Sequence, residues 1–209
     1  MNIVLFGDSI TDMGRDRTTD CLPFSLGMGY PFFIAGELKS VDPNRYTVYN
    51  RGIGGNRIVD LYARIKADVW NLKPDVLSIL IGVNDIWHEL DSQNGVDIER
   101  WEKVYRMILE DTKKRLPDCK IVLCEPFVLK GSATQEKYDG FLRVKQYAKI
   151  LKRIADEYNA LFLPLQEKFD LAAEKFGAEN YLYDGVHPSV LGAKLIADEW
   201  LKLFYEEIQ

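Results

Sequence analysis

The chain has 209 residues, of which 47% are hydrophobic and 28% are charged, and its formal net charge at pH 7 is -5. These values are typical of one folded domain with a core of its own, so they exclude a disordered chain and a small scaffold that depends on disulfides or metal. Lysine and arginine are scattered and no apolar run approaches the length of a membrane span, which argues against nucleic-acid binding and membrane insertion.

The first predicted element is a strand at the N-terminus. Residues 2–7 form an apolar, β-prone run, and Asp8-Ser9 follows directly after Gly7. A glycine permits a tight turn, so this strand would present a carboxyl and a hydroxyl group where it leaves the core. Ligands of open α/β sheets bind at this end of the strands. The alternative is that Asp8 and Ser9 only cap the next helix.

Strands and helices then alternate along the chain. Apolar runs predict further strands at residues 46–49, 75–81, 120–124 and 161–163. Apolar residues at helical spacing predict helices at residues 30–40, 58–72, 98–116, 138–158, 166–176 and 189–206, the last with Leu191 on its inward face. The remaining segments, 82–85 among them, are predicted as turns and loops. This order predicts a single domain, residues 1–209, with three α/β/α layers around a central five-stranded, mainly parallel sheet.

Polar clusters fall at several of the predicted strand ends and in a late loop: Asp8-Ser9, Gly54-Gly55-Asn56, Asn84-Asp85 and Asp184-x-x-His187. A serine needs a base to become a nucleophile, and the chain holds only two histidines, His88 and His187. His187 is the better candidate because the Asp184 carboxylate can hold its Nδ1–H while Nε2 faces Ser9. His88, in a predicted polar loop, is interpreted as an ordinary core or surface residue.

Acyl transfer also requires hydrogen-bond donors for a tetrahedral oxyanion. The backbone N–H of Ser9, an N–H of the glycine turn and the side-chain amide of Asn84 would supply three. Glycine lets the main chain approach an oxygen closely, and asparagine is a donor that cannot ionise. The expected substrate is a small molecule, neutral or weakly polar, and the reaction would need no cofactor and no metal.

The residues Gly7-Asp8-Ser9-Ile10, Gly55, Asn84 and Asp184-x-x-His187-Pro188, in this order across nearly the whole chain, resemble the four blocks of the SGNH (GDSL-type) hydrolase family. The resemblance implies a flavodoxin-like fold and hydrolysis of esters or thioesters. It implies that Ser9 is the nucleophile, His187 the general base and Asp184 its orienting carboxylate. The implied oxyanion hole consists of Ser9 N, Gly55 N and Asn84 Nδ2. Family members often have serine where this chain has Gly54, but a backbone donor does not depend on that side chain.

Three further segments, residues 11–15, 27–30 and 84–87, resemble the branch of bacterial intracellular acetylxylan and xylo-oligosaccharide acetyl esterases. The expected activity is therefore removal of small acyl groups, acetyl foremost, from sugar hydroxyls of short oligosaccharides. The alternatives are a lysophospholipase or acyl-thioesterase of the same family and, from another class, a carbohydrate-binding protein without turnover. The polar segments 89–96 and 130–140 argue against a long acyl groove, and four intact catalytic positions argue against a pure binder.

Candidate substrate-binding residues are Asp8, Trp87 and Tyr30. Trp87 could wall the pocket and stack on a sugar, or it could pack under its loop. Tyr30 and Tyr183 are weaker candidates for the same wall. Asp8 could instead hold neighbouring backbone amides.

Other polar residues admit two interpretations. Asp85 is either a second functional carboxylate or a cap. Asp8, Asp12 and Asp16 offer too few ligands for a cation site. Arg15 and Arg17 are interpreted as ion-pair partners or oligomer contacts.

The three cysteines, Cys21, Cys119 and Cys124, are an odd number and imply no structural disulfide. No signal peptide precedes the first strand, so the expected location is cytoplasmic. The resembling esterases often assemble, which makes a homo-oligomer a further expectation.

Overall fold

Five parallel strands form one sheet in the computed structural model, which describes residues 1–20 and 22–209. The strands are β1 (Asn2–Gly7), β2 (Thr47–Gly52), β3 (Val76–Leu80), β4 (Lys120–Cys124) and β5 (Leu161–Leu163). Their order across the sheet is β2-β1-β3-β4-β5, with every neighbouring pair parallel. This is the flavodoxin-like strand order, so the predicted α/β fold class is confirmed.

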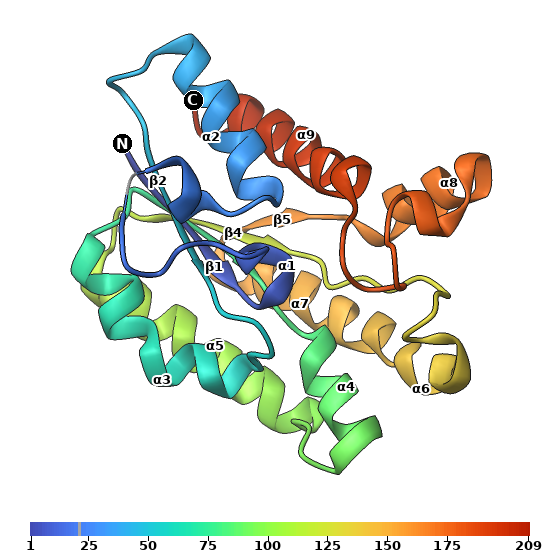
Figure 1. Cartoon of the computed structure of the whole chain (residues 1–209). Coiled ribbons are helices and arrows are strands. Elements are labelled where there is room, and N and C mark those ends of the chain that lie inside the picture. The colour runs from blue at the N-terminus through green and yellow to red at the C-terminus, as the bar shows by residue number, and fades with distance from the viewer. Residues whose placement is uncertain (21) are drawn as a thin grey trace.

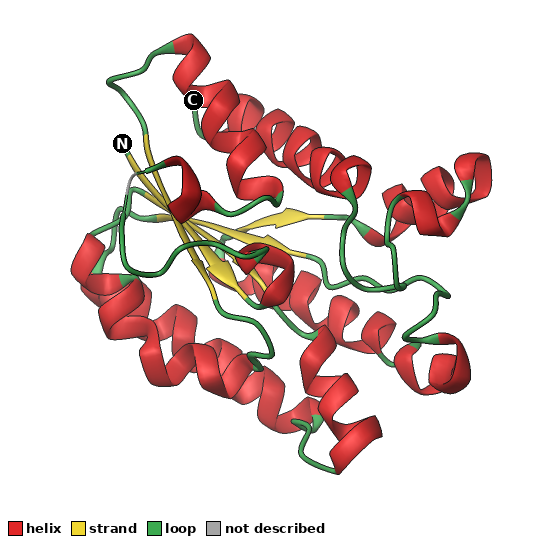
Figure 2. Cartoon of the chain, viewed as in Figure 1, coloured by secondary structure: helices red, strands yellow, loops and turns green. Residues whose placement is uncertain are grey.

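Helices cover both faces of the sheet (Figures 1 and 2). They are α1 (Ser9–Asp12), α2 (Tyr30–Val41), α3 (Ile58–Asp68), α4 (Val83–Ser92), α5 (Ile98–Arg115), α6 (Tyr138–Phe141), α7 (Val144–Tyr158), α8 (Gln166–Phe176) and α9 (Val190–Glu207). Short 3₁₀ helices lie at Pro23–Leu26, Trp70–Leu72, Gln135–Lys137 and Ala178–Asn180. Figure 1 shows α2 and α9 packed side by side on one face and α3, α5 and α7 on the other.

The central strands form the core. Residues Ile3, Val4, Leu5 and Phe6 of β1 are 0% exposed, as a strand covered by helices on both faces must be. On α9 the buried face includes Ile196, Trp200 and Phe204. Leu191, which the periodicity placed inward, is instead 53% exposed. It lies in the first turn of α9, where Gly192 and Ala193 are the first buried residues.

Two predicted segments differ from the structure, one in type and one in continuity. The turn predicted at residues 82–85 is the start of α4, so Asn84 and His88 lie on a helix and not in a loop. Gly82, at φ +140°, turns the chain directly from β3 into this helix, a conformation open mainly to glycine. The single helix predicted at 138–158 is divided into α6 and α7.

Two of the three cysteines lie in the described part of the chain. Cys119 and Cys124 are buried and carry free thiols, and burial raises the pKa of Cys124 to about 12. Cys21 lies outside the described residues. Among the described residues, no helix combines the length and the apolar character needed to cross a membrane.

Candidate active site

The carboxyl ends of three neighbouring strands meet at one edge of the sheet. Gly7, the last residue of β1, pairs with Gly52 of β2 on one side and with Leu80 of β3 on the other. The chain segments that follow these strands therefore leave the sheet together, at the point where the strand order reverses between β1 and β3. This topological switch point is where open α/β sheets bind ligands.

Ser9, His187 and Asp184 lie in one hydrogen-bonded chain at this edge. Ser9 Oγ is 2.8 Å from His187 Nε2, although the two residues are 178 positions apart in the sequence. His187 Nδ1 is 2.6 Å from Asp184 Oδ2. The second oxygen of Asp184 accepts the backbone N–H groups of Val186 (2.9 Å) and His187 (2.8 Å). With its Nδ1–H held by a carboxylate, the imidazole presents Nε2 as the acceptor for the serine hydroxyl.

The electrostatic environment of these three side chains favours an ionised Asp184 and a basic His187. Burial disfavours the Asp184 carboxylate, but hydrogen bonds from the His187 side chain and from two backbone N–H groups outweigh it, so the pKa of Asp184 lies below its ordinary value. The hydrogen bond to Asp184 raises the pKa of His187 above its ordinary value, against the effect of desolvation. A base of this kind can take a proton from a serine hydroxyl near neutral pH.

The three predicted oxyanion donors border the same site. Gly55 has φ +80°, and a Cβ at neighbouring Gly54 would lie 3.8 Å from Ser9 Cβ, which puts this turn beside the hydroxyl. Within residues 1–20 and 22–209, the N–H groups of Ser9 and Gly55 make no hydrogen bond and remain free for a ligand. Asn84 is 5% exposed, and its Nδ2 lies 3.1 Å from the carbonyl oxygen of Asn56 and 3.4 Å from Asp8 Oδ2.

Two residues hold the glycine turn in place. Asp12 accepts the N–H of Gly54 (3.1 Å) and forms an ion pair with Arg17. Arg64 of α3 donates to the carbonyl oxygens of Gly7 and Arg51 (both 2.9 Å) and to Asn56 Oδ1 (2.7 Å). Arg64 thus ties the ends of β1 and β2 to the turn. Sequence reasoning missed this role, because an arginine on an amphipathic helix is ordinarily a solvated residue.

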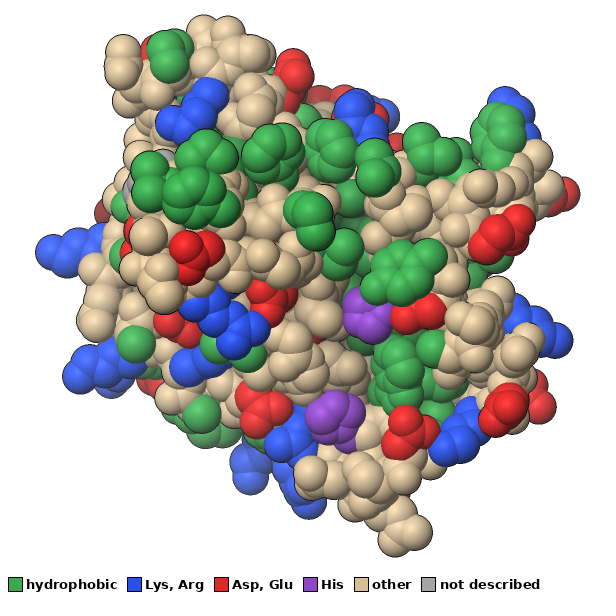
Figure 3. All heavy atoms as spheres, in the orientation of Figure 1, with side chains coloured by type: hydrophobic (Ala, Val, Ile, Leu, Met, Phe, Trp, Pro, Cys, Tyr) green, Lys and Arg blue, Asp and Glu red, His purple; other side chains and the backbone are tan. Residues whose placement is uncertain are grey.

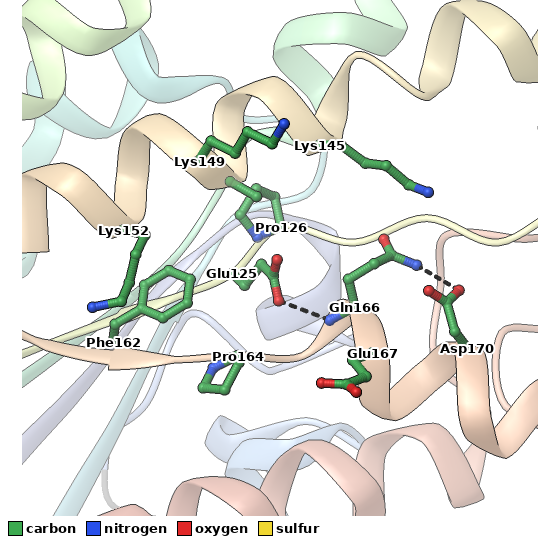
Figure 4. A pocket seen from close by; sticks show the side chains of 11 residues that line it. Glu125, Pro126, Lys145, Lys149, Lys152, Phe162, Pro164, Gln166, Glu167 and Asp170 are labelled. Carbon is green, nitrogen blue, oxygen red and sulfur yellow. Dashed lines mark hydrogen bonds between the residues drawn. The ribbon is translucent and has the colours of Figure 1, made fainter.

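A cavity of about 300 Å³ opens over the serine. It is lined by Ser9, Asp12, Met13, Gly14, Met28, Tyr183 and His187. Met13 and Met28 lie in segments 11–15 and 27–30, which resemble the acetyl esterase branch, but that resemblance does not indicate that their side chains line the cavity. A cavity of about 580 Å³ lies elsewhere, between α7 and α8 beside the edge strand β5, where Lys145, Lys149 and Phe162 line it (Figure 4). It contains none of the predicted site residues.

Two of the candidate substrate-binding residues are buried, which corrects that prediction. Asp8 is 0% exposed, and its Oδ1 accepts the N–H of Ile10 (2.9 Å) as the N-cap of α1. Burial raises the pKa of Asp8 to about 7. Tyr30 is also 0% exposed, and its hydroxyl is 3.0 Å from Thr11 Oγ1. A substrate in the cavity therefore meets neither side chain directly.

Trp87 and Asp85 have structural partners. The Trp87 ring packs edge-on against Phe141, with centroids 5.6 Å apart, and its Nε1 donates to Asp91 (2.9 Å). It also lies 6.0 Å from the His187 ring. Asp85 is fully buried inside α4 and accepts the N–H of Ile58 at the start of α3 (3.0 Å), so it binds a different helix from the one expected after Asn84.

Two arginines, Arg15 and Arg17, lie in the loop that follows α1. Each of them binds a group within the protein. Arg17 pairs with Asp12, and Arg15 donates to the carbonyl oxygen of Gly52 (2.8 Å). Among the described residues, no three His, Cys, Asp or Glu side chains gather in a way that could hold a metal ion.

A serine hydroxyl, an imidazole and a carboxylate joined by hydrogen bonds at the mouth of an α/β sheet form the constellation of the serine hydrolases. Residues 5–195 match the model of the GDSL-like lipase/acylhydrolase family. The chain belongs to this family and is an ester hydrolase.

Similar proteins are found by sequence and by structure. An acetylxylan esterase of Geobacillus stearothermophilus is 35% identical over 96% of this chain and 92% of its own length. The crystal structure of Axe2, an acetylxylan esterase from the same organism, matches with a TM-score of 0.86 at 35% identity, covering 96% of this chain and 92% of Axe2. A protein described as a GDSL-like lipase from Parabacteroides merdae matches with a TM-score of 0.91 at 39% identity, covering 96% and 94%. Catalytic mutants of Axe2 replace a serine, an aspartate or a histidine by alanine.

Proposed function

We propose that this protein is a serine acetylesterase that removes acetyl groups from hydroxyls of short carbohydrate chains such as xylo-oligosaccharides. The observation that carries the proposal is the hydrogen-bonded chain from Ser9 Oγ through His187 to Asp184 beside free backbone N–H groups. The similarity to acetylxylan esterases of Geobacillus stearothermophilus supports the substrate class, since the match extends over 96% of the chain.

In the first half of the proposed reaction, Ser9 Oγ attacks the carbonyl carbon of the acetyl ester while His187 Nε2 takes the hydroxyl proton. The negative charge on the carbonyl oxygen is stabilised by the N–H groups of Ser9 and Gly55 and by the Asn84 amide. The tetrahedral intermediate then collapses to an acetyl-serine, and His187 gives its proton to the departing sugar oxygen.

In the second half, water attacks the acetyl-serine. His187 takes a proton from this water, and the new tetrahedral intermediate expels Ser9 Oγ, which recovers a proton from His187. The products are acetate and free enzyme. Throughout the cycle Asp184 keeps the imidazole in the correct tautomer and stabilises its protonated form. None of these steps uses a redox or metal centre.

A comparison of hydrolysis rates for different esters tests the proposal. Initial rates are compared for acetylated xylo-oligosaccharides, for 4-nitrophenyl acetate, butyrate and octanoate, and for a long-chain acyl thioester, with Ser9→Ala as the background control. We expect turnover of the acetylated oligosaccharides and a fall in kcat/KM from acetate to octanoate. A preference for octanoate or for the thioester would favour a lysophospholipase or acyl-thioesterase. Binding of oligosaccharide without hydrolysis of any ester would favour a carbohydrate-binding protein.

A further inference from the structure

We propose that Tyr183 and Met28 form a platform for the alcohol part of the ester and select substrates by their leaving group. This inference rests on the proposed function and adds to it the residues that recognise the sugar. Both side chains line the cavity over Ser9 and are highly exposed, Tyr183 at 55% and Met28 at 77%. Large apolar groups left open beside a reactive hydroxyl are available to a substrate.

Tyr183 lies directly against the general base. Its ring stacks on the imidazole of His187, with centroids 5.8 Å apart and an angle of 16° between the planes. Because His187 Nε2 must donate a proton to the leaving oxygen, that oxygen comes within about 3 Å of Nε2 in the reaction. The group attached to the leaving oxygen therefore emerges next to Tyr183. The proposed oxyanion donors are the N–H groups of Ser9 and Gly55 and the amide of Asn84, and Tyr183 is not among them, so the carbonyl oxygen points to other residues.

The chemistry of the platform suits one face of a sugar ring. A flat aromatic ring and a polarisable thioether offer apolar contact to the C–H groups of a pyranose. The carboxylate of Asp12 lines the same cavity and can accept hydrogen bonds from sugar hydroxyls. An uncharged sugar satisfies both kinds of contact.

Exposed apolar side chains are also found outside the cavity. The first turns of α2 and α9 carry Phe32 (47% exposed), Val190 (72%) and Leu191 (53%). Figure 3 shows apolar side chains gathered on the face of the molecule that carries these two helices. Neighbouring sugar units of an oligosaccharide would extend over these exposed apolar side chains. Trp87 packs on Phe141, donates a hydrogen bond to Asp91 and lies 6.0 Å from the His187 ring, so its contact with a sugar stays a separate prediction.

The test varies the alcohol and the acyl group separately. kcat/KM is measured for ethyl acetate, 4-nitrophenyl acetate, 4-nitrophenyl butyrate and an acetylated xylo-oligosaccharide with the wild type, Tyr183→Ala, Tyr183→Phe, Met28→Ala and the control Leu171→Ala. Leu171 of α8 is 57% exposed, comparable to Tyr183, and is not among the residues that line the cavity. The acid limb of the pH profile is recorded for each variant to detect a displaced His187.

We expect Tyr183→Ala to lower kcat/KM about tenfold for the two acetates with ring-shaped alcohols, largely through KM, and less than twofold for ethyl acetate. Met28→Ala should act in the same direction but more weakly, while Tyr183→Phe and Leu171→Ala remain close to the wild type. The ratio of acetate to butyrate rates should not change. The proposal would be wrong if Tyr183→Ala lowered kcat/KM equally for all alcohols, changed the ratio of acetate to butyrate rates or shifted the pH profile.

Failure of the proposed function gives a different result. If the wild type hydrolyses 4-nitrophenyl acetate but not the oligosaccharide, the sugar assignment is wrong. The comparison of 4-nitrophenyl acetate with ethyl acetate still decides whether Tyr183 recognises the leaving group.

Discussion

At the scale of single residues, His187 connects the site's geometry to its pH dependence. Its Nδ1–H is bound to Asp184, which raises the pKa of the imidazole above its ordinary value. In the proposed mechanism His187 is the general base, which works only when it is unprotonated, so activity should fall as the pH drops through this raised pKa. The pH at which kcat/KM falls on the acid side therefore depends on the hydrogen bond between His187 and Asp184.

Replacing Asp184 tests this connection. In Asp184→Asn the carboxylate that favours the protonated imidazole is gone, so we expect the acid limb to move to lower pH. The rate should fall by about 10⁴, because the amide no longer holds the correct tautomer. The measurement is kcat/KM for 4-nitrophenyl acetate against pH. An acid limb that stays in place would show that another group controls it.

Asp8 makes a prediction about stability. Burial raises its pKa to about 7 from an unfolded value near 3.8, so the folded protein binds more protons than the unfolded chain between these two values. The contribution of Asp8 to stability is therefore retained at pH 4 and decreases as the pH rises toward 7. Asp8→Asn keeps a capping side chain but cannot ionise. Its melting temperature relative to the wild type should rise between pH 5 and pH 8.

Asp97 provides a matched control for this measurement. It is the N-cap of α5, and the hydrogen bond from the N–H of Arg100 lowers its pKa. A lowered carboxyl pKa contributes stability above the unfolded pKa that is lost in acid, the opposite trend. The melting temperature of Asp97→Asn relative to the wild type should therefore be lowest at neutral pH. The same trend in both variants would contradict the assignment for Asp8.

At the scale of the elements, close backbone approach brings α1 and the glycine turn together. A Cβ at Gly52, the last residue of β2, would lie 2.2 Å from the backbone nitrogen of Asp12 in α1. The two segments are therefore in direct contact, and the bond from Gly54 N–H to Asp12 is one consequence. Such contacts between distant segments cannot be read from hydrophobic periodicity.

Arg64 links these elements and can be tested alone. Lysine keeps the charge but cannot reach two carbonyl oxygens, an amide oxygen and Asp68 from one planar group. For Arg64→Lys we expect a loss of about 10- to 100-fold in kcat, since a displaced turn misaligns an oxyanion donor. Lys66→Arg, on the same helix, is the control. Unchanged kcat in Arg64→Lys would mean that the turn holds its geometry without this residue.

The sequence predicts the limits of a helix or strand well where its hydrophobic pattern fits only one type of structure. The predicted limits of β4 and β5 agree with the observed ones, because each strand is a short, mostly apolar run between polar residues. The start of α4 was missed because Gly82-Val83-Asn84-Asp85 fits a turn as well as a helix start. Tyr30 was misplaced because its spacing fits both a pocket wall and the core, and only packing distinguishes the two.

At the scale of the whole molecule, the strand order explains why the motifs come together. β1 is central, with β2 on one side and β3 on the other, so the segments after these three strands share one edge. The loop that carries Asp184 and His187 reaches this edge from the segment before α9. The motif predicts that Ser9, Asp184 and His187 lie together, whereas the contacts of Arg64 and the place of the Met13 and Met28 side chains in the cavity follow only from the fold.

The catalytic assignment depends on Ser9 being the group that becomes acylated, and peptide mapping tests this most directly. The protein is inactivated with a serine-directed organophosphate, digested and analysed by mass spectrometry. We predict one stoichiometric adduct on the peptide that contains Ser9, formed in proportion to the loss of esterase activity and absent from Ser9→Ala. An adduct on another residue that accounts for the lost activity, or full activity in Ser9→Ala, would contradict the assignment.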